Sequence, residues 1–347
     1  MDESTSWPGF SAERDAPSAS ANKGFSTVFE TPGWRALVEK TYGYPYSPLD
    51  VSLRSGYRVS VQSYVVERRL GLFDVLTSVP PHYYGGLRAP HGLSTEECLE
   101  LAEEIEASKR IHSLTLALHP LDPTAPSAAE SLGRYVHSRS STHILELQRS
   151  FNDLWKDAFD RQQRNRVRRA MRAGVQVRPD ASDAALERFQ EAYHECAVRW
   201  KLADGEPPGY FFDLKRFLEP HLVMWVATVD GKVVAGLMVL NHGDTAYFLH
   251  EASLVDYWDC CPNNLLYATA IEGACDAGMH YCDFLPSNRI SGVEEFKRNF
   301  GGQPRAFSIY RFTNKWYARV RRLAHVMGLR GRRNVNGRKA MAEIPGS

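Results

Sequence analysis

The chain has 347 residues, of which 43% are hydrophobic and 24% charged, and its formal net charge is only +1. This length suits two domains better than one hydrophobic core, and the composition is that of a globular protein. No apolar run approaches the roughly 20 residues of a membrane-spanning helix, so no such helix is expected.

The first 24 residues are rich in Ser, Ala and Pro and lack the order of a signal peptide, so they are expected to form a disordered leader. The 6 cysteines show no paired spacing typical of a zinc site. We expect them to be reduced, which favours a cytoplasmic location, with contact at the inner face of the membrane left open. Neither a metal nor a tightly bound cofactor is expected.

Hydrophobic periodicity divides the first half into helices and strands. In chain order we expect a helix at 34–42, extended stretches on both sides of 55–56 with the second reaching residue 65, a strand at 72–77, a helix after the capping box at 94–97, a strand at 114–118, a helix at 128–137 and a strand at 143–147.

The second half follows a similar course. Its expected elements are a helix at 186–200, a short helix at 211–218, strands at 222–229 and 232–240 joined by an Asp-Gly hairpin, a strand at 245–252, a helix at 264–277, a strand at 281–285, a helix at 293–300 and a strand at 307–312.

The shared order of elements predicts a duplicated α+β domain, although the halves show no visible sequence identity. We expect two tandem domains, at 25–147 and 148–312, each a mixed and mostly antiparallel sheet flanked by helices. The second domain is expected to carry the chemistry. A basic helix and tail should follow at 313–347.

Positive charge is concentrated in two segments that contain no acidic residue, at 161–172 and at 315–339. Such clusters attract polyanions, including tRNA, phospholipid headgroups and nucleotide diphosphates. The alternative is a solvated helix face followed by a basic tail. An amphipathic pattern at 316–329 is compatible either with an anionic membrane surface or with a helix docked on the first domain.

Lys297 lies between Phe296 and Phe300 in the helix that the Gly301-Gly302 pair ends. The two phenylalanines share one face of the helix, which is expected to pack inward. From spacing alone a solvent-facing lysine is favoured, because most lysines on helices are exposed. The functional alternative is a lysine that holds a phosphate or stabilises the negative charge that develops on a carbonyl oxygen.

Polar residues also follow two predicted strands of the second half. Asp283, Ser287 and Asn288 come at or just after one strand, where cleft residues commonly lie, and a structural role for Asp283 is an equal alternative. His250 and Glu251 end another strand. Because neighbouring strand residues point to opposite faces, at most one of them can face a cleft as a general base.

In the first half, the segment from Ser78 to Gly86 joins a strand to a Gly-rich loop. Gly85 would allow the backbone to approach a ligand, and Tyr84 would add a hydroxyl and a ring face. A turn filled by aromatic side chains is the alternative. The chain has no Walker-type loop, dinucleotide fingerprint, zinc pattern or nucleophile elbow, so ATP-driven, redox and metal-dependent functions lack support.

Taken together, these segments resemble the FemAB-like branch of the GCN5-related N-acetyltransferase (GNAT) superfamily, which includes peptidoglycan aminoacyltransferases and BioF2-like acetyltransferases. The resemblance spans residues 25–312. It is carried by the loop at 78–86, the basic helix at 164–175, the central helix with its Pro-Asn-Asn-Leu-Leu start at 262–266, and Asp283-Phe284 followed by Phe296-Lys297 and Phe300-Gly301-Gly302.

The resemblance implies two GNAT-like domains and transfer of an acyl group to an amine. It implies that Lys297 lies beside the reacting ester and stabilises the oxyanion, and that Tyr84 and the helix from Arg164 to Arg168 face the acceptor or its phosphates. The residues themselves add Glu251 and His250 as candidate catalytic bases, with simple surface residues as the alternative. Together, the expected substrate-binding residues are Tyr84, Gly85, Arg164, Arg168, Asp283, Ser287, Asn288 and Phe296.

One departure bears on the acyl donor. Acyl-CoA-using relatives carry a glycine-containing pyrophosphate loop before the central helix, whereas residues 255–263 contain no glycine. The leading hypothesis is therefore an acyltransferase that uses aminoacyl-tRNA, with acyl-CoA as the second donor. The acceptor would be a small-molecule or peptide amine, as in peptidoglycan, polysaccharide or peptide-natural-product modification. A third hypothesis is a non-catalytic protein that binds polyanions or membranes on the same scaffold.

Overall fold

The computed structural model describes residues 25–69, 73–79, 83–89, 91–199, 205–287 and 290–316. The expected leader at 1–24, Asn288 and almost all of the expected C-terminal helix and tail lie outside the described residues. None of the described helices combines the length and the apolar character that crossing a membrane requires.

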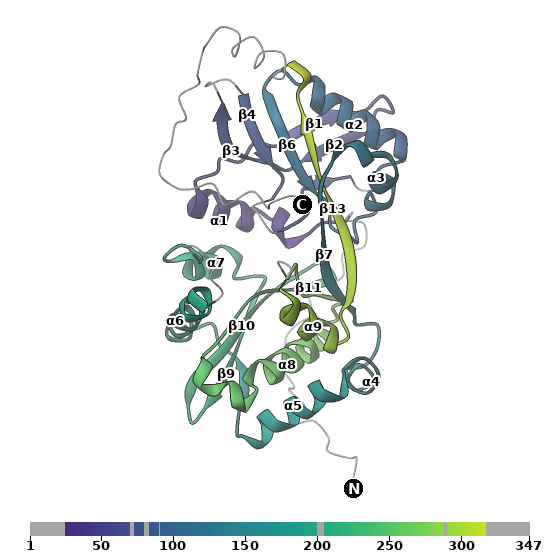
Figure 1. The fold of residues 1–347 in the computed structure, drawn as a ribbon. Coiled ribbons are helices and arrows are strands. Elements are labelled where there is room, and N and C mark those ends of the chain that lie inside the picture. Colours follow the sequence, from purple (N-terminus) through teal and green to yellow (C-terminus); the bar gives the residue numbers. More distant parts are fainter. Residues whose placement is uncertain are drawn as a thin grey trace.

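Two lobes stand one above the other and are joined by two long strands, β7 and β13 (Figure 1). The described strands are β1 (Leu49–Ser52), β2 (Arg58–Val61), β3 (Tyr64–Arg69), β4 (Phe73–Thr77), β5 (Leu87–Arg88), β6 (Ile111–Ala117), β7 (Val136–Glu146), β8 (Gln176–Pro179), β9 (Leu222–Val229), β10 (Lys232–His242), β11 (Thr245–Ser253), β12 (Tyr281–Asp283) and β13 (Gln303–Thr313).

The described α-helices are α1 (Pro32–Tyr42), α2 (Thr95–Ala107), α3 (Ala125–Ser131), α4 (Phe151–Asp153), α5 (Arg161–Arg172), α6 (Asp183–Arg199), α7 (Tyr210–Leu218), α8 (Pro262–Asp276) and α9 (Ser291–Asn299). Single turns of other helix types are η1 (Val28–Glu30), η2 (Gly133–Tyr135), η3 (Leu154–Ala158) and η4 (Val255–Cys260).

A 10-stranded sheet runs through both lobes in the order β3-β4-β6-β13-β7-β12-β11-β10-β9-β8, and a small sheet of β1, β2 and β5 lies beside it. Each half contains one pair of parallel strands joined through a helix, β4–α2–β6 and β11–α8–β12. The last strand of each half pairs with the other half, because β7 lies beside β12 and β13 beside β6.

The strands β7 and β13 also pair with each other in antiparallel fashion along most of their length. The α+β class and the mostly antiparallel pairing are therefore confirmed. The two expected sheets are joined at the centre into one, because the final strands of the two halves are exchanged.

The local predictions hold best where a turn or cap is specified by its own residues. The hairpin between β9 and β10 turns at Asp230 and Gly231, which both have positive φ, as the Asp-Gly pair predicts. Ser94 and Glu97 form both hydrogen bonds of the capping box at the start of α2.

Several element boundaries differ from the predictions because tertiary contacts intervene. The stretch predicted to be extended through residue 65 is divided between β2 and β3, where the buried Gln62 side chain donates a hydrogen bond to Phe29 O at 2.7 Å. The helix predicted at 128–137 ends early because β7 already begins at Val136. Strand β12 ends at Asp283, where Leu285 adopts φ +58 and turns the chain.

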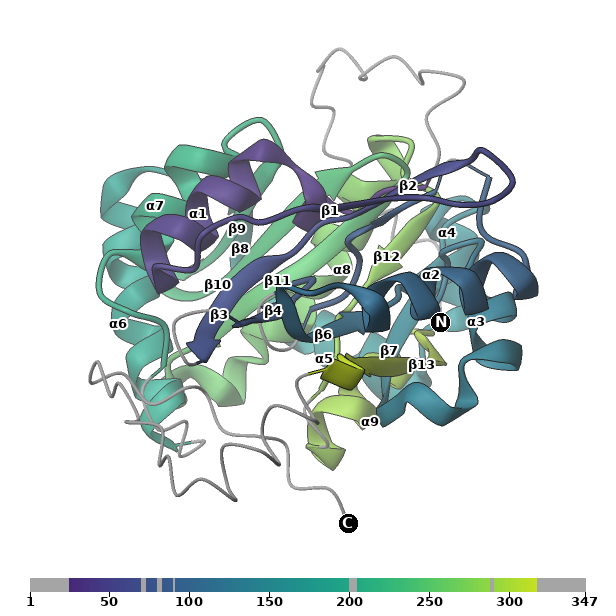
Figure 2. The same ribbon diagram turned by 90° about the horizontal axis from the view of Figure 1, so that it is seen from above.

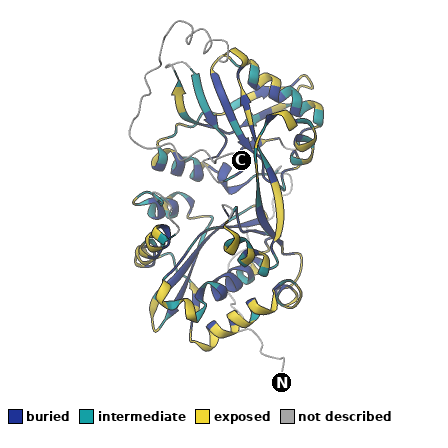
Figure 3. Ribbon diagram, viewed as in Figure 1, coloured by how far each residue is buried: buried dark blue, intermediate teal, exposed yellow. Residues whose placement is uncertain are grey.

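Helices cover both faces of the sheet in the second half. Helices α5 and α8 lie on one face and α6 and α7 on the other, as seen from above in Figure 2. Close approach depends on two glycines: a Cβ at Gly236 of β10 would lie 2.6 Å from the Phe189 ring, and one at Gly273 of α8 would lie 2.6 Å from the Trp225 ring. The buried residues form three clusters, and in β7 only residues 142–145 are buried (Figure 3).

Candidate active site

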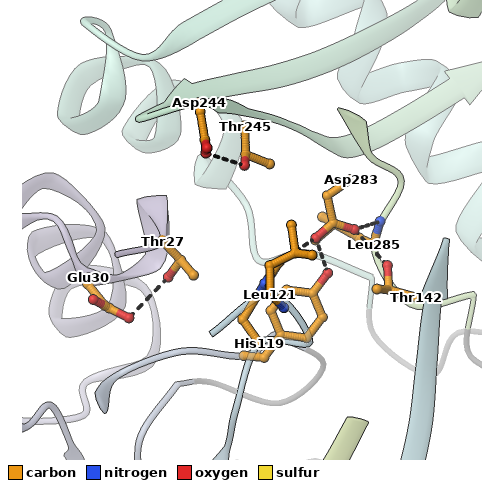
Figure 4. Close-up of polar contacts among 10 residues, drawn as sticks. Thr27, Glu30, His119, Leu121, Thr142, Asp244, Thr245, Asp283 and Leu285 are labelled. Atoms are coloured by element: carbon orange, nitrogen blue, oxygen red, sulfur yellow. Dashed lines mark hydrogen bonds and ion pairs between the residues drawn. The ribbon is translucent and has the colours of Figure 1, made fainter. Parts of the chain in front are cut away.

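The centre of the molecule holds a buried carboxylate, that of Asp283 at the end of β12, which has no exposed surface. Its Oδ1 accepts hydrogen bonds from the Thr142 hydroxyl at 2.6 Å and from the Leu285 N–H at 2.9 Å. Its Oδ2 accepts from the Tyr84 hydroxyl and from His119 Nε2, the latter at 2.9 Å. Figure 4 shows His119, Thr142 and Leu285 around Asp283.

The partners of Asp283 keep it ionised. The Leu121 N–H donates to His119 Nδ1 at 3.0 Å, so His119 Nε2 carries the proton that points at the carboxylate. Burial alone would raise the pKa of Asp283, but the hydrogen bonds from His119, Thr142 and Tyr84 hold it below its usual range.

This geometry gives a structural role to two of the residues that were predicted to bind substrate. Tyr84 and Asp283 are both fully buried, and the Tyr84 hydroxyl donates to the Asp283 carboxylate. The pair joins the first half of the chain to the second and positions the segment after β12. This is the structural alternative considered for Asp283.

The segment after Asp283 carries the acceptor for Lys297. Lys297 Nζ donates a hydrogen bond to Leu285 O at 2.8 Å, and only 5% of the residue is exposed. The spacing-based expectation of a solvent-facing lysine is therefore wrong. Burial lowers the pKa of Lys297 to about 8, and the negative charges of Glu251, Asp283 and Glu294 oppose this shift.

The glycine pair after α9 explains why Lys297 points inward. Gly301 has φ +87, and a Cβ there would lie 2.7 Å from Ala158 Cβ. A Cβ at Gly302 would lie 2.9 Å from the ring of Phe284. Because neither contact leaves room for a side chain, the end of α9 can lie directly against these neighbours, and the preceding turn directs Lys297 into the protein.

Glu251 lies on β11 opposite Lys297. Burial raises the pKa of Glu251, whereas a hydrogen bond from the Tyr267 hydroxyl and the positive charge of Lys297 act in the opposite direction. The two charged groups attract each other without forming a contact ion pair in the described part of the chain. Tyr267 on α8 and Lys297 on α9 thus lie on the same side of the sheet as Glu251.

The sheet has an opening between β11 and β12, beside Glu251 and Lys297. Strand β12 pairs with β11 only over Thr245–Tyr247, whereas β11 continues to Ser253 paired with β10 on its other side. Residues 248–253 consequently have no strand partner on the β12 side among the described residues. Glu251 lies on the diverging part of β11, and Lys297 is anchored just after the end of β12.

Several buried polar atoms near Lys297 are not satisfied by the protein. Glu251 Oε2, Ser287 Oγ and His143 Nδ1 have no hydrogen-bond partner among the described residues. Burial lowers the pKa of His143, and the positive charge of Lys297 lowers it further. A buried unpaired polar group costs about 1–3 kcal/mol, so such groups commonly mark where a ligand binds.

His250 lies on the other face of β11, as the alternation of strand residues predicts. Its Nε2 lies 3.2 Å from the Tyr210 hydroxyl of α7, and burial lowers its pKa to about 3. The prediction of His250 as a base beside Lys297 is therefore wrong, and Glu251 is the residue of the pair that faces the opening.

The remaining predicted substrate-binding residues take different positions. Gly85 has φ +118, and a Cβ there would lie 2.6 Å from Thr27 Oγ1, so its close approach is to the protein and not to a ligand. Ser287 is buried near the segment that binds Lys297, and Phe296 is half-buried with its ring 4.9 Å from that of Tyr267. Asn288 lies outside the described residues.

The two arginines predicted to bind substrate differ from each other. Arg164 Nη1 donates to three backbone carbonyls at the end of η3, at 2.6 to 3.2 Å, which makes it a capping residue and corrects its predicted role. Arg168 is exposed, with its guanidinium 5.6 Å from the ring centre of Trp155. The outer surface of α5 remains basic, and Arg169 lies 3.8 Å from Asp259 of η4.

The glycine-free segment before α8 forms the helical turn η4, in which the Cys261 N–H donates to Trp258 O at 2.9 Å. The Cys261 amide is therefore not free to bind a pyrophosphate. No group of three or more His, Cys, Asp or Glu residues that could hold a metal ion occurs within the described ranges.

Sequence analysis did not identify several residues of this site. His119, Thr142, His143 and Tyr267 are brought to it by strands and helices distant in sequence.

Comparison with known proteins gives similarities to one family and to solved structures of the same fold. Residues 159–298 match the family described as an acetyltransferase (GNAT) domain. The fold is similar to the crystal structure of FemX, with 14% identity, a TM-score of 0.66, and coverage of 87% of this chain and 94% of that chain. No curated protein matches the sequence.

Two further structures share the fold. One is a conserved protein of unknown function from Bacteroides thetaiotaomicron VPI-5482, with 13% identity, a TM-score of 0.54, and coverage of 81% of this chain and 90% of that chain. The other is the C-terminal domain of a putative lysylphosphatidylglycerol synthetase from Agrobacterium fabrum, with 12% identity, a TM-score of 0.52, and coverage of 85% and 93%.

Removing one donor to Asp283 should destabilise the protein. We expect Thr142→Val to lower the free energy of unfolding by about 2 kcal/mol, because a buried carboxylate loses a hydrogen bond of 2.6 Å while the side-chain shape is kept. Urea unfolding measures this change. Thr115→Val on β6 is the control and should change the free energy by less than about 0.5 kcal/mol. Equal losses in the two variants would contradict the importance assigned to Asp283.

Proposed function

With residues 159–298 forming a GNAT acyltransferase domain, we propose that this protein transfers an acyl or aminoacyl group from an activated donor to an amine. The donor is an aminoacyl-tRNA or an acyl-CoA, and the acceptor is a peptide or small molecule of the kind modified in peptidoglycan, polysaccharide or peptide-natural-product synthesis. The reaction takes place where β11 and β12 diverge.

The observation that carries this proposal is the buried ammonium of Lys297 beside that opening. One of its three N–H groups is used by Leu285 O, and among the described residues the other two have no hydrogen-bond partner and could bind a ligand. When an amine attacks a carbonyl, negative charge develops on the carbonyl oxygen. A fixed cation in a site of low dielectric constant stabilises that charge more than water does.

The reaction needs no group beyond donor, acceptor and side chains. The acceptor nitrogen forms a bond to the carbonyl carbon, and the carbon–oxygen or carbon–sulfur bond of the donor then breaks. The leaving alcohol or thiol takes up the proton that the amine loses. Glu251, whose pKa is raised by burial, is placed to accept that proton first.

The first half of the chain supports placing the reaction in the second half. In the first half, the parallel strands β4 and β6 correspond to β11 and β12. The loop that contains Gly85 lies beside the end of β6. The Gly85 N–H donates to Ala117 O at 2.8 Å, and the Ala117 N–H donates to Ser78 Oγ at 3.4 Å. The first opening is thereby filled by residues of its own loop.

The exposed arginines of α5 favour a polyanionic donor. Arg161, Arg166 and Arg172 are exposed on this helix, which packs against α8 close to η4. Because η4 uses its amides internally, a donor held through many phosphates by arginines fits better than a nucleotide held by a loop. The name of the lysylphosphatidylglycerol synthetase, a protein of similar fold, also describes an aminoacyl product. We therefore place aminoacyl-tRNA ahead of acyl-CoA.

Loss of the Lys297 cation should reduce catalysis and spare binding. We expect Lys297→Met to lower kcat by about 10²–10³-fold, the usual cost of removing one oxyanion donor. The assay follows a labelled aminoacyl group from aminoacyl-tRNA, and in parallel an acetyl group from acetyl-CoA, to lysine-containing peptides and amino sugars. Arg298→Met, an exposed neighbour on α9, is the control and should retain activity.

The same experiment distinguishes an acyltransferase from a protein that only binds its ligands. If the unmodified chain transfers neither group, and tRNA binding is equal in both variants, then the fold serves only for binding.

The pH profile should report the state of Lys297. The group is charged below its folded pKa of about 8 and loses its proton as the pH rises through that value, so kcat should fall above pH 8. An ordinary lysine would hold its charge to about pH 10. The falling limb should be absent in Lys297→Met. A limb that rises through pH 8 in the parent and disappears in the variant would mean that neutral Lys297 acts as a base instead.

Binding of aminoacyl-tRNA should depend on salt through α5. Replacing both Arg161 and Arg166 by Ala should reduce the slope of log K against log salt concentration by about 2, because each phosphate contact contributes about 1. Filter binding over roughly 50 to 200 mM salt measures this slope. Arg188→Ala on α6 is the control. Binding of acetyl-CoA that is tight and insensitive to salt would favour the acyl-CoA donor.

A further inference from the structure

A second candidate site lies on the face of β11 opposite Lys297. Glu206 precedes α7, and its carboxylate lies among tyrosines from both halves of the chain. We refer to these residues as the tyrosine cluster, and its members are Tyr42 of α1, Tyr83 of the first-half loop, Tyr193 of α6 and Tyr210 of α7.

Neutral groups surround the Glu206 carboxylate. The Tyr42 hydroxyl donates to its Oε2 at 3.1 Å, and His250 Nε2 lies 3.9 Å from its Oε1. Burial lowers the pKa of His250 to about 3, so this ring is uncharged near neutral pH. In the described part of the chain, no lysine or arginine forms an ion pair with Glu206.

The charge of Glu206 is also felt by the aromatic rings. Burial raises the pKa of Tyr83, Tyr193 and Tyr210, and the negative charge of Glu206 raises each further. The ring centres of Tyr193 and Tyr210 lie 5.6 and 5.4 Å from that of His250. Both rings therefore pack on the imidazole whose Nε2 lies 3.9 Å from Glu206 Oε1, and the Tyr42 hydroxyl contacts the carboxylate directly.

A carboxylate in such surroundings is costly without a cation. Burial raises the pKa of Glu206 to about 7, which shows how poorly its charge is compensated. Its side chain nevertheless keeps 15% of its surface exposed, so a ligand can reach it. Aromatic faces combined with one carboxylate are the arrangement that recognises alkylammonium groups, through cation–π and ionic attraction.

We propose that Glu206 and the tyrosine cluster bind an alkylammonium group of the acceptor. Because His250 and Glu251 are adjacent on β11 and point to opposite faces, the cluster and the Lys297 opening are separated by the thickness of one strand. The bound cation is therefore a second amine of the acceptor, distinct from the amine that is acylated. That the ligand is an acceptor rests on the proposed function, whereas the cation site itself does not.

The test compares two ligands that differ only in charge. Nα-acetyl-lysine N-methylamide and Nα-acetyl-norleucine N-methylamide are titrated by NMR against the full-length chain. We expect the lysine compound to bind at least tenfold more tightly than the norleucine compound. This comparison requires no variant, and equal binding of the two compounds would overturn the proposal.

Variants then locate the site. Glu206→Gln should reduce the affinity for the lysine compound at least tenfold, and Glu195→Gln, an exposed position on α6, should leave it unchanged. Thermal unfolding checks that Glu206→Gln is folded, since it removes an uncompensated charge without changing shape. Unchanged affinity in Glu206→Gln would overturn the assignment.

The outcome is separable from that of the proposed function. Selective binding of the lysine compound without any acyl transfer would leave the cation site standing and remove the enzymatic role. Acyl transfer without selective binding of the lysine compound would support the enzymatic role and overturn the cation site.

Discussion

The buried carboxylate of Asp283 is the interaction on which the centre of this molecule depends. An ionised group without solvent contact is stable only when its oxygens accept enough hydrogen bonds, and here four donors supply them. Three of those donors come from the first half of the chain and the carboxylate from the second. The requirement to satisfy Asp283 therefore ties the two halves together at one point.

The same group determines the path of the chain beyond β12. Because Asp283 accepts the Leu285 N–H, the strand ends and Leu285 turns with positive φ, so that its carbonyl meets Lys297 Nζ. Lys297 is thus held at the point where β11 and β12 separate. The position of the Lys297 ammonium therefore follows from the burial of the Asp283 carboxylate. Asp283 lies two residues before Leu285, whose carbonyl oxygen accepts the hydrogen bond from Lys297.

The exchange of the final strands explains how two similar halves can differ in use. Strands β7 and β13 each leave their own half and pair with the other, which makes one sheet and places both parallel-strand openings near the centre. In the first half the loop that contains Gly85 fills its opening. In the second half the corresponding strands remain apart beside Lys297 and Glu251, and we expect chemistry only there.

The two proposed sites lie on opposite faces of β11. Glu251 faces α8 and α9 with Lys297, and His250 faces α6 and α7 with Tyr210. A single strand can serve both sites because its side chains alternate. Under the two proposals, an acceptor passes β11 at residues 248–253, which have no described strand partner on the β12 side, and is held on one face and reacts on the other.

The sequence by itself determined the elements whose signals are local. The Asp230-Gly231 turn, the capping box at Ser94 and the long helix α8 follow from neighbouring residues, because their stabilising contacts span only a few positions. The order of these elements was also enough to indicate the α+β class. The family resemblance, and not spacing, singled out Lys297.

Only the tertiary structure decided which polar residues are buried and what they contact. Asp283 bonds to His119 and Thr142 from strands and loops more than a hundred residues away, and no local pattern encodes such pairs. Lys297 has the pattern of a surface lysine until the glycines after α9 bring its helix against the core. The charge, burial and partners of a side chain depend on the surrounding chain in space, which is why the sequence could name Lys297, Glu251 and Asp283 but could not assign their surroundings.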